Sequence, residues 1–312
     1  MPRSPTRCRT PDRPFFRARP RPPRTGRHRT GSARTPWALA GALLLAAVTG
    51  GCGSSDRDDV LRVGMDLNYR PFEMRDPAGN PAGVSVDLAE ALAASMDRPL
   101  RIVPMDFQGL LPALQSGGID LVISSMTRTA ERERQIAFSD PYVATGLCLL
   151  VSADSDITGI TDLNQAGRTV VVRTGTTGHV YAQNHLDQAT VLPQELPETC
   201  LAEVVNGNAD AFIYDQWSVL EYAAAHPQRT RAIAAPFQIE HWAIGMRRGE
   251  DDLREQVNGF LEEFRRDGGF ARIEQRYPEL EQRRRQLREL GLPFIFQVGD
   301  TGNAPPTTDA AD

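Results

Sequence analysis

From residue 60 onward, short apolar runs alternate with amphipathic helical segments, and the same order starts again near residue 168. In the first series, Leu88, Leu92 and Met96 recur at a spacing of four, which is typical of one helix face. Single helices between successive strands imply parallel pairing, because parallel strands need a crossover connection. The chain is therefore predicted to be an α/β protein with doubly wound sheets. The first series predicts strands at 60–64, 100–103 and 119–123 and helices at 84–96 and 107–115.

The second series repeats this pattern, and a last strand and helix follow it. The residues Gly175-Thr176-Thr177-Gly178 come directly after a strand and are expected to open a helix. The polar tail at 297–312 has too few apolar residues to pack and is predicted to be disordered. The expected strands are 168–172, 209–214 and 241–246, and the expected helices are 197–206, 216–225, 251–266 and 280–290.

The first 51 residues are typical of an export signal with an arginine-rich extension. They hold eleven of the 35 basic residues, and the apolar run 37–48 has the length of a signal-peptide core. The small residues 49–51 precede Cys52, which resembles the cleavage box of bacterial lipoproteins. Cys52 is therefore predicted to carry a lipid, with residues 52–59 as a tether. A simple signal peptide with an incidental cysteine is the alternative, and the true start codon stays open.

Charge argues against nucleic acid as a partner. From Cys52 onward the chain carries 24 basic and 39 acidic residues, a net charge of −15, with no basic stripe. Beyond the leader, no segment is long and apolar enough to cross a membrane. Contact with a membrane is therefore expected through the lipid anchor only.

Two cysteines remain in the expected mature core, Cys148 and Cys200. They lie 52 residues apart and have no Cys-x-x-Cys spacing, so no metal site is expected there. Export would permit a disulfide, and that pairing stays open. Their apolar surroundings favour two buried free thiols.

Four polar segments follow predicted strand ends and together offer what a free amino acid needs. Its carboxylate and ammonium each require an opposite charge and hydrogen bonds once they leave water. In open α/β sheets, ligands bind beyond the carboxyl ends of the strands. The segments are 64–73 (GMDLNYRPFE), 124–132 (SSMTRTAER) with 136–142 (IAFSDPY), 175–177 (GTT) and 214–215 (YD).

Each of these segments also has an ordinary structural interpretation. Arg132 lies in a charge-rich stretch that is typical of a solvated surface, and Asp215 could simply cap a helix. Residues 175–177 could be an ordinary helix start. Their order and spacing, taken together, favour a binding site.

The combined motifs resemble the bacterial family 3 periplasmic solute-binding proteins, which serve amino-acid ABC importers. The resemblance runs from about residue 61 to 277. It implies that Arg132 binds the ligand carboxylate and that Asp215 binds the ammonium. A planar guanidinium suits the first role because it matches a carboxylate with two parallel bonds. The ligand-binding residues expected are Asp66, Tyr69, Phe107, Ser124, Ser125, Thr127, Arg132, Arg173, Thr176, Thr177 and Asp215.

The resemblance also implies the type II fold of periplasmic binding proteins, in which a two-strand hinge joins two doubly wound lobes. One lobe would contain residues 57–144 and 238–296, and the other residues 145–237, with crossings near Gly146 and Trp242. The expected partners are an amino acid and the permease of an ABC transporter whose identity stays open. The protein is expected to be a monomer without cofactor or metal, in the periplasm or at the outer face of a membrane.

The identity of the amino acid is the least constrained feature. The resemblance places Arg173 and Asp66 near the ligand side chain, with Tyr69 and Phe107 as walls. One cation and one anion suit a neutral polar group, so an amide side chain such as that of glutamine is the prediction. Alternatively, Arg173 and Asp66 pair with each other, or Arg173 points to solvent, and an apolar ligand could then bind.

An enzyme on the same scaffold, similar to cyclohexadienyl dehydratase, is the alternative function. Its substrate prephenate is a dicarboxylate without an amine, and Asp215 would repel it. The motifs place no evident proton donor in the cleft. Glu73 is the nearest candidate, and it is expected at the rim or as a support for its loop. The chain is therefore predicted not to be an enzyme.

Overall fold

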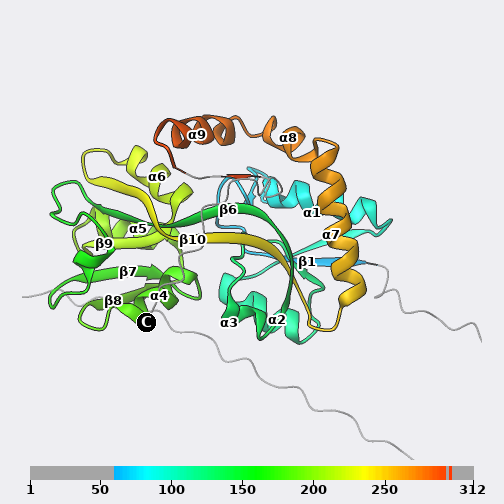
Figure 1. Ribbon diagram of the computed structural model, residues 1–312, viewed down its shortest axis with the longest axis horizontal. Coiled ribbons are helices and arrows are strands. Elements are labelled where there is room, and N and C mark those ends of the chain that lie inside the picture. The colour runs from blue at the N-terminus through cyan, green and yellow to red at the C-terminus, as the bar shows by residue number, and fades with distance from the viewer. Residues whose placement is uncertain (1–59, 293–294, 297–312) are drawn as a thin grey trace, which may run out of the picture. The chain divides into compact units, whose positions relative to one another are not determined.

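The computed structural model describes residues 60–292 and 295–296 of the chain. The predicted signal peptide, Cys52, the tether and the polar tail all lie outside these residues. Within the described part, nine strands form one sheet (Figure 1). The order is β4 (Leu100–Pro104), β1 (Leu61–Met65), β5 (Leu121–Val122), β10 (Thr230–Met246), β6 (Ala137–Ser152), β9 (Ala211–Asp215), β7 (Thr169–Arg173) and β8 (Thr190–Gln194), with β11 (Ile295–Phe296) paired to β6.

The sheet contains two parallel groups of strands joined by two long antiparallel strands. In the first strand group, β1 pairs in parallel with β4 and β5. In the second strand group, β7 pairs in parallel with β8 and β9. The long strands β6 and β10 pair antiparallel with each other and run side by side between the two groups (Figure 1). The predicted α/β class with doubly wound sheets is confirmed.

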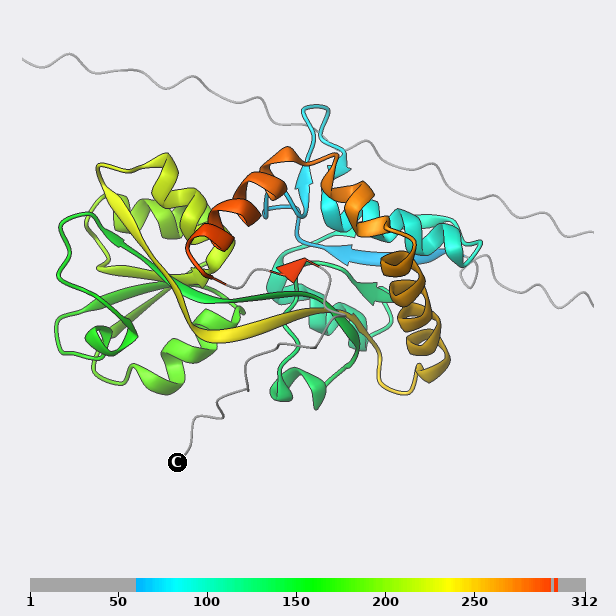
Figure 2. The same ribbon diagram turned by 45° about the horizontal axis from the view of Figure 1, so that its top comes forward.

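Helices follow the strands of both groups, close to their predicted bounds. Figure 2 shows α7 and α8 near the first group and α9 beside α6. The short pair β2 (Met74–Arg75) and β3 (Pro81–Ala82) forms a separate hairpin. The helices are α1 (Val84–Ser95), α2 (Leu110–Gln115), α3 (Ala130–Glu133), α4 (Thr177–His185), α5 (Pro197–Val205), α6 (Gln216–Ala225), α7 (Asp251–Arg266), α8 (Gly269–Glu274) and α9 (Pro278–Glu289), and the 3-10 turns are η1 (Phe107–Gly109) and η2 (Ile160–Leu163).

Apolar side chains fill both faces of the sheet, which explains why its strands appear as continuous apolar runs. On β6, Cys148 and Leu150 belong to one buried cluster, while Leu147, Leu149 and Val151 belong to another. This alternation follows the two-residue period of a strand. The first of these clusters extends from β1 to α9, so it joins elements that accompany both strand groups.

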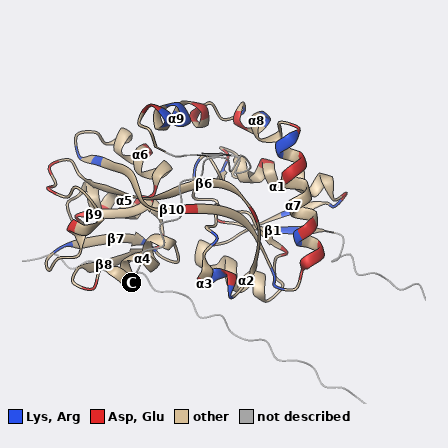
Figure 3. Ribbon diagram, in the orientation of Figure 1, with Lys and Arg blue, Asp and Glu red and all other residues tan. Residues whose placement is uncertain are grey.

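The charged helices cover the core with one apolar stripe each. Figure 3 shows acidic and basic residues along α7 and α9. The helix α9 nevertheless buries Leu280 and Leu287 in the cluster that also contains Trp217 of α6. Cys148 and Cys200 are buried free thiols, as the sequence predicted. Among the described residues, none of the helices combines the length and the hydropathy that crossing a membrane requires.

The two long strands pack tightly near Gly146, where the sequence analysis expected a crossing between the lobes. A β-carbon built on Gly146 would lie 2.5 Å from Cβ of Pro236 and 2.6 Å from the carbonyl oxygen of Gln238. The pairing of β6 and β10 changes register between Ile233 and Gln238, and again between Trp242 and Ala243. Glycine at 146 is therefore required by the close approach of β10.

Candidate functional site

One cavity lies beyond the strand ends of both groups and encloses about 50 Å³. By the usual measure this volume holds roughly three to five water molecules, which suits a small polar molecule. All eleven residues named from the sequence line this cavity. Five further residues line it as well. The lining consists of Asp66, Tyr69, Glu73, Phe107, Ser124, Ser125, Thr127, Arg132, Leu147, Arg173, Thr176, Thr177, Tyr214, Asp215, Glu240 and Trp242.

Arg132 is buried in this cavity rather than solvated, with 8% of its surface exposed. Its guanidinium donates to the carbonyl oxygen of Thr127 at 2.7 Å and to that of Gly175 at 3.0 Å. The ring of Phe107 lies 5.6 Å from the guanidinium carbon. Two of the five N–H groups are thus used by the backbone, and this end of the cavity can bind a carboxylate.

Residues 175–177 form a helix start, as predicted. Thr176 is the N-cap of α4, and its hydroxyl accepts from the backbone N–H of His179 at 3.4 Å and donates to the carbonyl of Arg173 at 2.7 Å. The next residue, Thr177, is the first of the helix and lines the cavity. Backbone N–H groups of a first helical turn have no partners within the helix, so this place favours a negative group.

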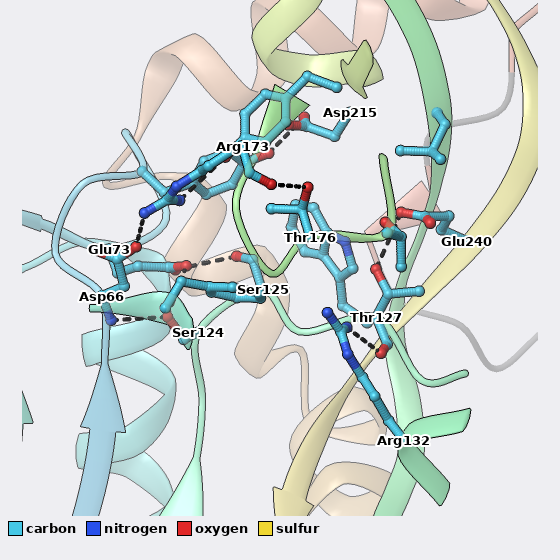
Figure 4. A pocket seen from close by; sticks show the side chains of 16 residues that line it. Asp66, Glu73, Ser124, Ser125, Thr127, Arg132, Arg173, Thr176, Asp215 and Glu240 are labelled. Atoms are coloured by element: carbon cyan, nitrogen blue, oxygen red, sulfur yellow. Dashed lines mark hydrogen bonds and ion pairs between the residues drawn. The ribbon is translucent and has the colours of Figure 1, made fainter. Parts of the chain in front are cut away.

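Asp215 serves both roles that the sequence allowed. Its carboxylate caps α6 by accepting from the backbone N–H of Ser218 at 3.0 Å, and it also accepts from the hydroxyl of Tyr69 at 2.5 Å. Burial raises the pKa of Asp215, while the hydrogen bonds from Tyr69 and Ser218 oppose that shift. Figure 4 shows Asp215 and Arg132 at opposite ends of the cavity. The cavity therefore offers a cation and an anion to the two charged groups of a zwitterion.

Asp66 and Arg173 pair directly with each other, which is one of the alternatives that the sequence left open. Their side chains are only 2% and 5% exposed. Arg173 also donates to the carbonyl of Glu195 at 3.1 Å and to the hydroxyl of Tyr214 at 3.3 Å. The nearby ring of Phe107 lies 5.6 Å from its guanidinium carbon. This end of the cavity therefore presents a neutralised ion pair.

Glu73 lies inside the cavity, so of the two placements expected for it the rim is wrong, and the support for its loop stays. It is 1% exposed and accepts from the hydroxyl of Ser85 at 2.6 Å and from that of Ser125 at 3.1 Å. Burial raises the pKa of Glu73 to about 8. Ser125 has a φ of 48°, a left-handed conformation that is uncommon outside glycine and typical of functional sites. The sequence pattern could not show this burial, because Glu73 follows a segment that mixes polar and apolar residues without a helix or strand period.

Glu240 is a second cavity carboxylate, and sequence reasoning missed it. It is 3% exposed and accepts from the hydroxyl of Thr127 at 3.1 Å and from the side-chain amide of Gln238 at 3.2 Å. It lies within the long strand β10 and not at a strand end, so no spacing rule pointed to it. Within the described residues, no cluster of three His, Cys, Asp or Glu could hold a metal ion.

Comparison with known proteins places this site in a family. The model of the family described as bacterial extracellular solute-binding proteins, family 3, matches residues 61–279. The L-arginine-binding protein of Pseudomonas aeruginosa is 28% identical over 252 residues, which cover 77% of this chain and 95% of that protein. The ABC transporter glutamine-binding protein of Bacillus subtilis is 26% identical over 220 residues, which cover 69% and 80%.

A solved structure agrees with these relatives. The crystal structure of an ancestral amino acid-binding protein, described as a precursor of cyclohexadienyl dehydratase, is 34% identical with a TM-score of 0.65. The match covers 71% of this chain and 96% of that one. The family match spans both strand groups and all the cavity residues. This chain belongs to the bacterial extracellular solute-binding proteins of family 3.

Proposed function

We propose that the protein binds a free L-amino acid in the cavity between its strand groups and delivers it to an ABC importer outside the cytoplasm. The observation that carries this proposal is the placement of Arg132 and Asp215 at opposite ends of one cavity (Figure 4). An amino acid carries one negative and one positive group, both attached to its α-carbon. Relatives named for arginine and glutamine binding support the same class of ligand.

The proposed contacts divide the ligand into three parts. Arg132 binds the α-carboxylate together with the hydroxyls of Ser125, Thr127 and Thr177. Asp215 binds the α-ammonium. The side chain then lies between the rings of Tyr69 and Phe107, near Asp66, Ser124, Arg173 and Thr176, all of which line the cavity.

The proposed lobes are residues 57–144 with 238–296, and residues 145–237. In the structure, Arg132 belongs to the part that carries the first strand group, and Asp215 ends a strand of the second. A ligand that bridges them contacts both lobes only when they are close together. That gives it a higher affinity for the closed arrangement, which is the condition for driving closure about β6 and β10.

The ligand side chain is proposed to be polar and uncharged, with an amide as the best fit. The Asp66–Arg173 pair leaves no net charge at this end, and the raised pKa of about 8 keeps Glu73 mostly neutral at pH 7. A cationic side chain would meet Arg173 and an anionic one would meet Asp66. The carboxyl, guanidinium and hydroxyl groups there can still exchange hydrogen bonds with an amide.

The protein is proposed to bind without turnover. One similar structure is a precursor of cyclohexadienyl dehydratase, so the enzyme alternative requires a direct test. Incubation with prephenate and with arogenate, followed by chromatography, should yield neither phenylpyruvate nor phenylalanine above the uncatalysed rate. Product formation that depends on the protein would overturn this part of the proposal.

Location and anchoring are proposals from the sequence. We infer export to the periplasm or the outer face of a membrane, with Cys52 lipidated and the ABC permease as the partner. Mass spectrometry of the mature N-terminus would show two acyl chains on Cys52. Cleavage elsewhere, or an unmodified Cys52, would contradict the anchor without affecting the binding site.

A thermal-shift screen against the twenty amino acids tests the function directly. A ligand at a hundred times its dissociation constant stabilises the folded state by about 2.7 kcal/mol, which is a measurable shift of the melting temperature. Competition among glutamine, arginine, glutamate and leucine then tests the side-chain proposal. Leucine binding most tightly would refute a polar ligand, and arginine binding most tightly would show that Asp66 alone sets the preference.

A further inference from the structure

Glu240, on the strand β10, has hydrogen-bond partners from the segments that follow both strand groups. Its carboxylate accepts from Thr127 on the chain segment after β5 and from Gln238 two residues earlier on β10. The hydroxyl of Thr177, at the start of α4, is also hydrogen-bonded to it. The site proposed for the amino acid thus already contains a buried carboxylate (Figure 4).

The partners of Glu240 are the partners that the ligand carboxylate needs. Thr127 and Thr177 are two of the three hydroxyls proposed to bind the α-carboxylate, and Arg132 is the proposed cation. The positive charge of this guanidinium also interacts with the carboxylate of Glu240. A bound amino acid would therefore bring a second carboxylate to donors that one carboxylate already uses. Two carboxylates in one buried site do not both stay ionised without a large cost.

We infer that Glu240 is a resident competitor of the ligand α-carboxylate and that it takes up one proton from solvent when the amino acid binds. This inference rests on the proposed function, because it needs a ligand carboxylate at Arg132. Once protonated, Glu240 changes from an acceptor into a donor. Its O–H can then bond to the ligand, and Thr127 and Thr177 can turn to the ligand as well.

The surroundings of Glu240 contain few other titratable groups. Arg132 faces it from α3, and Cys148 on β6 is close to it, but burial raises the pKa of that thiol, which stays neutral. Thr145 lies directly opposite on β6, and its buried hydroxyl has no hydrogen-bond partner among the described residues. Burial raises the pKa of Glu240, whereas the hydroxyls of Thr177 and Thr127 and the charge of Arg132 lower it. A second anion beside it raises that pKa further, which gives the direction of proton transfer.

The sign of the pH dependence follows from proton uptake. If the complex holds one more proton than the free protein, the association constant falls as pH rises, by up to about tenfold per pH unit. The fall begins above the pKa of Glu240 in the free protein and ends at its pKa in the complex. Below that window the affinity is constant.

Isothermal titration of the mature protein with L-glutamine and with L-arginine, at pH 7, 8 and 9, tests the inference. Each pH is measured in two buffers with different ionisation enthalpies, so that the difference in observed heat gives the protons taken up. Wild type should take up as much as one proton per ligand at one or more of these pH values. Glu240→Gln should bind without uptake and lose the pH dependence.

Two further variants make the result specific to this residue. Glu250→Gln removes a carboxylate at the surface and should keep the uptake of wild type, because its side chain is 38% exposed and far less desolvated. Glu73→Gln removes the other buried cavity glutamate, whose pKa of about 8 lies within the tested range, and so separates uptake by Glu73 from uptake by Glu240. Equal heats in both buffers for wild type would overturn the inference alone, as would loss of uptake in Glu73→Gln with uptake retained in Glu240→Gln. Absence of binding by every amino acid would instead overturn the proposed function, and the inference with it.

Discussion

Replacing Arg132 by alanine is the most direct test of the proposed carboxylate site. In the structure this side chain is 8% exposed, donates to two backbone carbonyls and has three N–H groups left for a ligand. Truncating one member of a buried charged contact usually costs about 2–5 kcal/mol of binding free energy. The dissociation constant should therefore increase by a factor between roughly 30 and several thousand.

The assay is calorimetric titration with the tightest ligand of the thermal-shift screen. Arg128→Ala is the matched control, because this arginine lies in the same motif but is 43% exposed and pairs with Glu133. It should bind within about twofold of wild type, since exposed ion pairs contribute little. Arg132→Lys should fall between the two, because it keeps the charge and loses the planar pair of donors.

One result would refute the assignment. If Arg132→Ala binds as tightly as wild type, the ligand carboxylate lies elsewhere in the cavity or in another site. A melting curve of each variant separates loss of binding from loss of fold. Some loss of stability is expected with Arg132→Ala, because the carbonyls of Thr127 and Gly175 lose a charged donor.

Three further predictions concern charge, pH and packing. Asp66→Asn should shift ligand preference toward glutamate, and Arg173→Gln should shift it toward arginine. Each shift should be on the order of tenfold relative to glutamine, because each variant leaves a buried charge unpaired. A shift of the same sign in both variants would contradict the pair as the basis of specificity. The pKa of Glu73 is raised in the folded state from 4.5 to about 8, so its contribution to stability is complete below about pH 4.5 and is lost as pH rises through 8, by at most ~1.4 kcal/mol per unit. Urea unfolding at pH 5 and pH 8 should therefore show a smaller loss in Glu73→Gln than in wild type, and equal losses would contradict that. Gly146→Ala should lower the free energy of unfolding by about 1–3 kcal/mol, because its new β-carbon would collide with β10. Gly159→Ala is the control and should be near neutral, because nothing lies within 4 Å of its new β-carbon. Equal unfolding midpoints for the two variants would show that β10 moves aside freely.

The sequence predicted those site residues that stand at the ends of strands. Asp66 follows β1, and Asp215 is the last residue of β9. Such positions converge in any open α/β sheet, so a polar residue just after an apolar run indicates a site even without coordinates. Arg132 was found through its motif, and its burial could not be derived from the charged residues around it.

Other features depend on contacts that are distant in sequence. Asp66 and Arg173 are 107 positions apart, and nothing local decides whether they pair with each other or with a ligand. The full length of β6 could not be predicted from the sequence either, because Pro141 and its polar neighbours resemble the end of a strand. In the structure, Pro141 pairs with Ala243 beside a change of register, where a missing N–H is tolerated. Glu240 left no local signal, because one acidic residue within a strand is common.

Polar contacts join the two proposed lobes across the cavity, and they use groups that a ligand would also need. Asp66 binds Arg173, the hydroxyl of Tyr69 binds Asp215, and Arg132 binds the carbonyl of Gly175. A ligand must therefore add interactions beyond those that the protein already makes when its lobes are together. Since a net hydrogen bond contributes only about 0.5–1.5 kcal/mol, selectivity cannot come from the number of contacts alone. Selectivity must come from which ligand satisfies the buried charges once it has replaced these contacts between the lobes. Arg132 is the group with the most N–H donors left for a ligand. For that reason the carboxylate end should set affinity, while the neutral pair of Asp66 and Arg173 should set the choice among amino acids.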